Sequence, residues 1–133
     1  MIEGGCQCGT LRYQAGGDVS DLSHCHCSMC RKLHGAAFAT FAAVERKKFE
    51  WTEGEASVGV YASSESMDRF FCGRCGSQLM VFYKSEPDVV YLTLGTVDGN
   101  PDCPPGYHQF VGSKAPWHEI TDDMPQHDGW PDE

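Results

Sequence analysis

The chain has 133 residues, a formal net charge of −9 and eight cysteines. The length predicts one domain over residues 1–133. The acidic balance argues against a nucleic-acid partner, because phosphate binding needs clustered Lys and Arg. No secretory signal is visible, and the longest apolar stretch, Ala36–Val44, is far shorter than the ~20 residues of a membrane-spanning helix. We therefore expect a soluble, cytoplasmic protein with no membrane partner, whose reduced cysteines bind metal rather than cross-link.

Short runs rich in Val, Phe, Tyr and Thr recur between turn residues and predict an all-β fold. Ser28–His34 contains good helix formers followed by glycine, so it is the one helix expected. Prolines make Asn100–Gly106 a loop, and the tail after Trp117 is expected to be irregular. The predicted strands are Thr10–Ala15, Ala36–Ala43, Ser57–Ala62, Arg69–Cys72, Gln78–Tyr83, Val89–Leu94 and His108–Val111.

The cysteines fall into groups of two, three, two and one along the chain. Two cysteines separated by one or two residues place both thiolates on one side of a tight turn, as two corners of a zinc tetrahedron with Zn–S bonds of ~2.3 Å. Two such pairs would make a closed four-sulfur site and leave the triplet as an open three-sulfur site, although spacing alone does not fix this combination. The groups are Cys6 with Cys8, then Cys25, Cys27 and Cys30, then Cys72 with Cys75, and finally Cys103.

Other interpretations of these cysteines stay open. Cys72 and Cys75 alone match a thioredoxin-like redox motif, but no βαβ pattern surrounds them. A disulfide framework conflicts with the expected compartment. Both zinc ions would be purely structural if His24 or His26 completed the second site. Cys103 has no partner by spacing and is expected to be a free or buried thiol.

Three thiolates around one zinc ion make a soft, anionic site and a weak Lewis acid. Such a site suits the binding of a fourth sulfur from a substrate, so the sequence indicates thiol chemistry, for example a carbon–sulfur bond made or broken at an aldehyde carbon. Strand alternation would point His24 and His26 away from a metal held by Cys25 and Cys27.

Several other polar and aromatic residues have ambiguous roles in the sequence. Arg31 follows Cys30 and has the planar fork that pairs with a substrate carboxylate. His108 and Lys114 are further candidates of the same kind. Trp117 and Phe110 are expected in the core or in a cavity wall.

A set of motifs spread over most of the chain resembles one known family. The order Gly5-Cys6-Gln7-Cys8-Gly9, Cys25-His26-Cys27-Ser28-Met29-Cys30-Arg31, Arg69-Phe70-Phe71-Cys72-Gly73-Arg74-Cys75-Gly76 and Gly95-Thr96-Val97-Asp98 is similar to that of the glutathione-dependent formaldehyde-activating enzyme family, which includes centromere protein V. The stretch from His108 through Lys114 to Trp117 adds to the likeness.

This resemblance implies a β-tent of packed antiparallel sheets with zinc knuckles and little helix. It implies a structural zinc on Cys6, Cys8, Cys72 and Cys75, and a catalytic zinc on Cys25, Cys27 and Cys30. It also implies carbon–sulfur lyase activity of the S-(hydroxymethyl)glutathione synthase type, with a small thiol such as glutathione and an aldehyde as partners. The rival hypothesis is a non-catalytic zinc module that binds glutathione or a protein.

Overall fold

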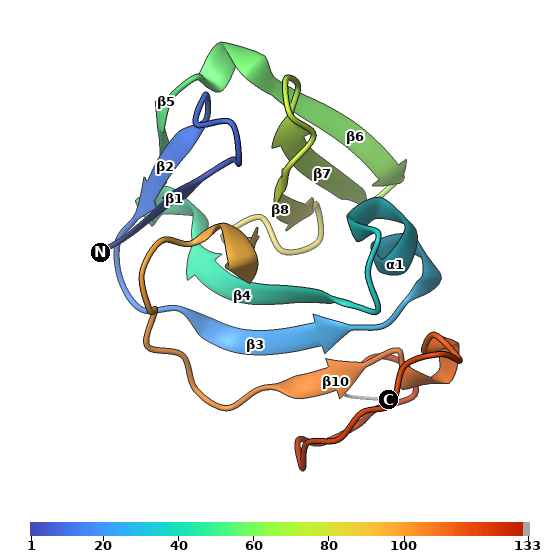
Figure 1. Ribbon diagram of the computed structural model, residues 1–133. Helices are drawn as coiled ribbons and strands as arrows, with labels where there is room; N and C mark the ends of the chain where they lie inside the picture. The colour runs from blue at the N-terminus through green and yellow to red at the C-terminus, as the bar shows by residue number, and fades with distance from the viewer. Residues whose placement is uncertain (132–133) are drawn as a thin grey trace.

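The computed structural model describes residues 1–131 and has an all-β fold with one short α-helix, as predicted (Figure 1). A three-stranded sheet has the order β1-β2-β5, and a seven-stranded sheet has the order β10-β3-β4-β9-β8-β7-β6. The elements are β1 (Ile2–Gly5), β2 (Arg12–Ala15), β3 (Ser20–Cys25), α1 (Ser28–His34), β4 (Ala39–Glu45), β5 (Phe49–Glu53), β6 (Val58–Ser64), β7 (Met67–Cys72), β8 (Gln78–Tyr83), β9 (Val89–Thr93) and β10 (Tyr107–Gln109).

Helix α1 and strand β8 have the predicted bounds. The helix ends where Gly35 adopts the left-handed conformation, with φ of 59°, and its N–H bonds the carbonyl of Arg31. Three strands escaped prediction. Strand β1 ends in two glycines and β3 is mostly polar, so neither shows the apolar alternation that marks a half-buried strand. Strand β5 does alternate Phe49 and Trp51 with polar residues, but it is only five residues long.

Within the described residues, all strand pairs are antiparallel except one. β10 lies beside β3 in parallel, with His108 opposite His24 and Gln109 opposite Cys25. The expectation of purely antiparallel sheets is corrected at this edge. A parallel partner needs a long crossover, and here the chain after β9 runs through the proline-rich loop 97–106 before β10 begins. Gly106 passes so close to Leu22 that no side chain would fit there.

The buried residues form two clusters. The larger one joins both sheets and includes the fully buried side chains of Tyr13, Leu11, Leu79 and Leu92. The smaller one contains Cys25 and Cys30, together with Ala39, Phe41, Met67 and Val81. The triplet of cysteines is therefore built into an apolar part of the molecule. Within residues 1–131, no helix is long and apolar enough to cross a bilayer.

Candidate metal centres and the adjoining cavity

The first candidate centre joins two turns that are far apart in the sequence. The sulfurs of Cys6 and Cys8, between β1 and β2, lie within 4.8 Å of those of Cys72, the last residue of β7, and Cys75, in the turn that follows. Cys6 Sγ lies 3.6 Å from Cys8 Sγ, and Cys8 Sγ lies 3.9 Å from Cys72 Sγ. A tetrahedron with Zn–S bonds of ~2.3 Å has sulfur–sulfur edges of about 3.8 Å, so this set fits a zinc ion.

Backbone amides surround the sulfurs of this first cluster. The Leu11 N–H donates to Cys6 Sγ at 3.2 Å, and the N–H groups of Arg74 and Cys75 donate to Cys72 Sγ at 3.4 and 3.5 Å. Such donors stabilise thiolate charge. Hydrogen bonding from Ser77 lowers the pKa of Cys75 to about 5, in the same sense. The turns are therefore already arranged for anionic sulfur.

The second candidate centre is formed where β3 runs into α1. The sulfurs of Cys25, Cys27 and Cys30 lie within 4.8 Å of one another. Cys27 is the N-cap residue of α1, and its sulfur accepts a hydrogen bond from the Cys30 N–H at 3.3 Å. Cys25 and Cys30 are buried and Cys27 is partly exposed. The cluster offers three soft ligands, one fewer than the tetrahedral set at the first centre.

The charges within the triplet indicate that it suits a cation. Hydrogen bonds from Cys25 and Cys30 lower the pKa of Cys27 to about 2, and the charge of Arg69 acts in the same direction. The pKa of Cys25 is raised, because its sulfur is hydrogen-bonded to the neighbouring sulfurs and is also buried. Three adjacent sulfurs cannot all ionise without a compensating charge, and a divalent metal ion supplies that charge.

Arg69 on β7 is the positive side chain of this centre. It is only 2% exposed, and its Nη1 and Nη2 lie 3.8 and 3.7 Å from Cys30 Sγ. Its Nε donates to Ser63 Oγ at 3.2 Å, which fixes the guanidinium plane. Arg31, the arginine singled out by the sequence, does not line the cavity described next. Strand alternation was the available signal for Arg69, because Met67, Arg69 and Val81 are buried on one face of this part of the sheet.

A cavity of about 380 Å³ opens onto the triplet. Cys25, Cys27 and Cys30 line it, whereas no cysteine of the first centre does. The volume is within the range of small-molecule sites. The aromatic wall of the cavity consists of Phe41, Tyr83, Tyr91, Tyr107, Phe110 and Trp130. The two cysteine clusters thus differ in access as well as in ligand number.

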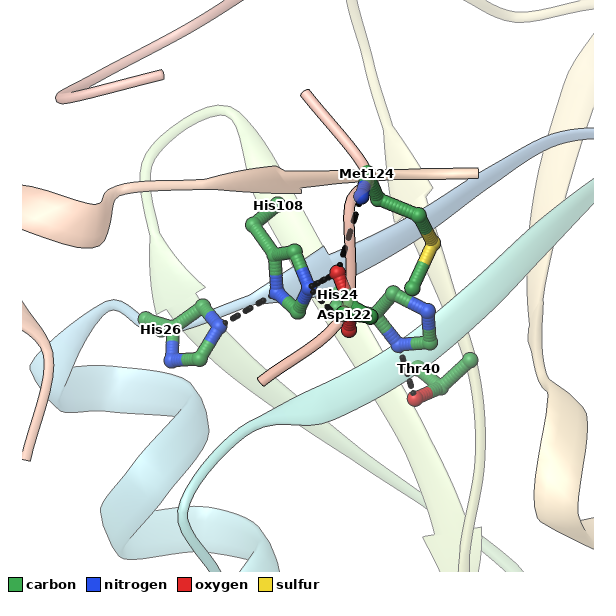
Figure 2. Close-up of polar contacts among 6 residues, drawn as sticks. All are labelled: His24, His26, Thr40, His108, Asp122 and Met124. Atoms are coloured by element: carbon green, nitrogen blue, oxygen red, sulfur yellow. Dashed lines mark hydrogen bonds and ion pairs between the residues drawn. The ribbon is translucent and has the colours of Figure 1, made fainter. Parts of the chain in front are cut away.

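Neither His24 nor His26 lines the cavity, as strand alternation predicts, and both rings lie beside the ring of His108 (Figure 2). His26 Nε2 lies 2.8 Å from His108 Nδ1, and His108 Nε2 lies 3.0 Å from a carboxylate oxygen of Asp122. His24 Nδ1 lies 2.8 Å from Thr40 Oγ1. These three contacts are made with groups other than the clustered cysteines, and nothing in the sequence singled out Asp122.

The carboxylate of Asp122 determines which ring nitrogens of His108 and His26 carry the protons. The hydrogen bond with His108 holds the pKa of Asp122 below its usual value, so the carboxylate accepts and His108 Nε2–H donates. His108 Nδ1 then accepts from His26 Nε2–H. Burial, with the charge of His108, lowers the pKa of His26 to about 4, which keeps its ring neutral near pH 7.

Comparison with known proteins shows the family to which the chain belongs. The model of the family described as glutathione-dependent formaldehyde-activating enzyme matches residues 1–113. The chain belongs to this family. The match confirms the resemblance seen in the motifs, and it includes all seven clustered cysteines, Arg69 and His108. Asp122 and Trp130 lie beyond it.

Individual relatives of the family agree with this assignment. A Halomonas elongata protein named for the same family is 28% identical over 130 residues, covering 90% of this chain and 81% of the relative. A Schizosaccharomyces pombe protein named as an uncharacterized lyase is 29% identical over 115 residues, covering 76% of this chain and 82% of the relative. A crystal structure of a Rhodobacter sphaeroides protein has a TM-score of 0.64 at 21% identity, covers 74% of this chain and 89% of its own, and shows that the fold is shared.

The structure also locates the other residues that the sequence singled out. Phe110 lines the cavity, as expected. Trp117 is 70% exposed, so its expected place in the core or a cavity wall is wrong. Lys114 Nζ donates to the carbonyls of Ala115 and His118 and so stabilises the turn that follows β10. Cys103 is partly buried against the larger core cluster, and burial raises the pKa of its thiol.

Proposed function

We propose that the chain is a zinc-dependent carbon–sulfur lyase that joins a small thiol and formaldehyde reversibly, as S-(hydroxymethyl)glutathione synthase does. Cys25, Cys27 and Cys30 are the proposed ligands of the catalytic zinc, and Cys6, Cys8, Cys72 and Cys75 those of a structural zinc. The family match and the names of the relatives support lyase chemistry. One observation carries the proposal: the cluster with three sulfurs opens onto a cavity, whereas the cluster with four does not.

A zinc ion at the triplet would keep a substrate thiol deprotonated near neutral pH. The thiol sulfur forms a bond with the carbonyl carbon, the π electron pair moves to the oxygen, and that oxygen takes a proton equivalent to the one lost from sulfur. The reverse direction breaks the same carbon–sulfur bond and returns both substrates.

Side chains that line the cavity supply hydrogen-bond donors and limit the access of water to the reacting atoms. Arg69 and Tyr83 both line the cavity. Burial, followed by the nearby cysteines, raises the pKa of Tyr83 well above its ordinary value, so its phenol keeps its proton near pH 7. A guanidinium and a neutral phenol are suitable hydrogen-bond donors for an aldehyde oxygen that gains negative charge. The aromatic wall limits water around the reacting atoms.

The direct test mixes the zinc-loaded protein with glutathione and formaldehyde and follows adduct formation by NMR. We expect acceleration above the uncatalysed rate, loss of that acceleration in Cys27→Ser, and full retention in Cys103→Ser, a matched change outside both clusters. Stoichiometric thiol binding without turnover would favour the non-catalytic zinc module. Absence of acceleration with glutathione and with every other cellular thiol tried would sink the lyase proposal.

A further inference from the structure

The charges around the cavity are unusual for a site that binds glutathione, a thiol with two carboxylates. Among residues 1–131, two carboxylates line it, those of Asp21 and Glu86. Both are exposed to solvent, and each is held by a tyrosine that also lines the cavity. Tyr107 Oη donates to Asp21 Oδ1 at 2.7 Å, and Tyr91 Oη donates to Glu86 Oε1 at 3.0 Å. These hydrogen bonds restrict where the two carboxylates lie.

Positive charge is scarce in the same cavity. Of the residues that line it, Arg69 is the one Lys or Arg. Its guanidinium is buried against Cys30 Sγ and bonded to Ser63, so its charge is matched to the sulfur cluster. A substrate carboxylate that lies beside Asp21 and Glu86, away from the triplet, would therefore lose water without gaining a cationic partner, and that loss is costly.

The aromatic wall favours the opposite charge. Tyr83, Tyr91 and Trp130 surround the space, and Trp130 packs edge-on against Phe110 with ring centroids 4.8 Å apart. Aromatic faces attract cations, especially ammonium groups that carry methyl substituents. Carboxylates and aromatic rings together form the usual environment for a bound ammonium group.

From this arrangement we infer that the cavity selects thiols that carry a positively charged nitrogen close to the sulfur, over thiols that carry carboxylates such as glutathione. This inference rests on the proposed lyase function and narrows its substrate class. Asp21 and Glu86 would act as specificity residues that touch the cationic group, while the cysteine triplet holds the sulfur. The side chain of Trp130, which lies beyond the part of the chain matched by the family model, would complete the selective wall.

Three thiols that share a two-carbon spacer between the sulfur and the head group test the inference: thiocholine as the cation, 2-mercaptoethanol as the neutral reference and 3-mercaptopropionate as the anion. Thiocholine is chosen because a primary amine would cyclise with formaldehyde. Adduct formation is measured for each thiol relative to its own uncatalysed rate. Binding without formaldehyde is measured in parallel by calorimetry on the zinc-loaded protein, which gives a readout independent of turnover.

We expect the wild-type protein to prefer thiocholine over 3-mercaptopropionate by about tenfold in both measurements, with 2-mercaptoethanol between them. Asp21→Asn and Glu86→Gln keep the hydrogen-bond acceptors but remove the charges, and each should lower that preference by about threefold, as expected for a partly exposed charge pair. Glu55→Gln, an exposed acid that does not line the cavity, removes the same net charge and should leave the preference unchanged.

Each other outcome has a definite meaning. Equal use of the three thiols, a preference for the anion, or no binding of any of them overturns the inference. So does a preference that Glu55→Gln lowers as much as Glu86→Gln, because the global charge of −9 would then explain it. Preferential binding of thiocholine with no acceleration for any thiol overturns the lyase proposal and leaves the binding preference standing.

Discussion

The rings of His26 and His108 are joined by a hydrogen bond of 2.8 Å between Nε2 of the first and Nδ1 of the second. His26 lies between two cysteines of the triplet, and His108 is held in turn by Asp122 from the C-terminal segment (Figure 2). The backbone adds to this link, since His108 N–H bonds the Pro125 carbonyl and His127 N–H bonds the His108 carbonyl. The C-terminal segment therefore supports β3, the strand that carries Cys25, through its contacts with β10.

We expect Asp122→Ala to weaken metal retention at the triplet without affecting the four-sulfur cluster. The change removes the acceptor that sets the tautomer of His108, and with it the orientation of His26 next to Cys25 and Cys27. Groups that orient metal ligands typically change metal affinity by about tenfold, and this more distant residue should approach that value. Chelator competition with the zinc-loaded protein measures the affinity of each site separately.

Two further variants give the control and the rescue for Asp122. Asp122→Asn keeps an oxygen acceptor and should restore most of the affinity. Asp123→Ala removes the neighbouring exposed carboxylate and should have no effect. Equal losses in Asp122→Ala and Asp123→Ala would show that the carboxylate has no positioning role.

The sequence predicted what depends on local chemistry. Helix formers followed by Gly35 located α1, and cysteine spacing separated the pairs from the triplet that the structure brings together. It could not reveal contacts made by tertiary arrangement. The contact of Arg69 with Cys30 joins β7 to α1, and the chain from Asp122 to His26 depends on the parallel pairing of β10 with β3. Alternation along β7 indicates which face Arg69 occupies, but it does not show that Cys30 lies against that face. Nothing in the sequence indicates that β10 pairs with β3.

The two cysteine clusters should respond differently to the loss of one ligand. Wild-type protein is expected to hold two zinc ions per chain by metal analysis. Cys27→Ser should lower this to one while the far-ultraviolet circular dichroism stays native, because the triplet lies outside the larger buried cluster that joins the two sheets. Cys72→Ser should unfold the domain, since a structural zinc contributes on the order of 10 kcal/mol to a small fold. A folded Cys72→Ser protein that binds one zinc would contradict the structural role of the first cluster.

Arg69→Gln should impair both activity and stability, because it leaves the sulfurs of the triplet without their buried positive neighbour. Removing one partner of a buried charge pair costs about 3 kcal/mol in the free energy of unfolding, measured by urea denaturation. Acceleration of adduct formation should fall at least about tenfold, since Arg69 also lines the cavity. Arg69→Lys keeps the charge but loses the fork that reaches both Ser63 and Cys30, so it should be intermediate.

Arg74 supplies the matched control for that experiment. It is an exposed arginine in the turn between Cys72 and Cys75, and it does not line the cavity. Arg74→Gln should therefore leave both the acceleration and the free energy of unfolding close to the wild-type values. If Arg69→Gln also matched wild type in activity, the guanidinium would have no part in the reaction.

Tyr13 should make the fold sensitive to alkaline pH. Its side chain is 1% exposed, its hydroxyl donates to Thr96 Oγ1 at 2.8 Å, and burial raises its pKa to about 12. In the unfolded chain a tyrosine has a pKa of about 10. The unfolded state therefore loses the proton first, so the stabilising contribution is complete below about pH 10 and falls by about 1.4 kcal/mol per pH unit as the pH rises toward 12.

Urea unfolding of wild type and Tyr13→Phe near pH 9 and pH 11 measures this contribution. Near pH 9 wild type should be more stable by about 1 kcal/mol, the net value of the lost hydrogen bond. Near pH 11 the advantage should vanish or reverse, because only wild type still has the phenol to ionise on unfolding. Tyr61→Phe removes an exposed tyrosine and should show the same difference from wild type at both pH values. A difference between wild type and Tyr13→Phe that stays constant from pH 9 to pH 11 would mean that the Tyr13 hydroxyl ionises as readily in the fold as in the unfolded chain.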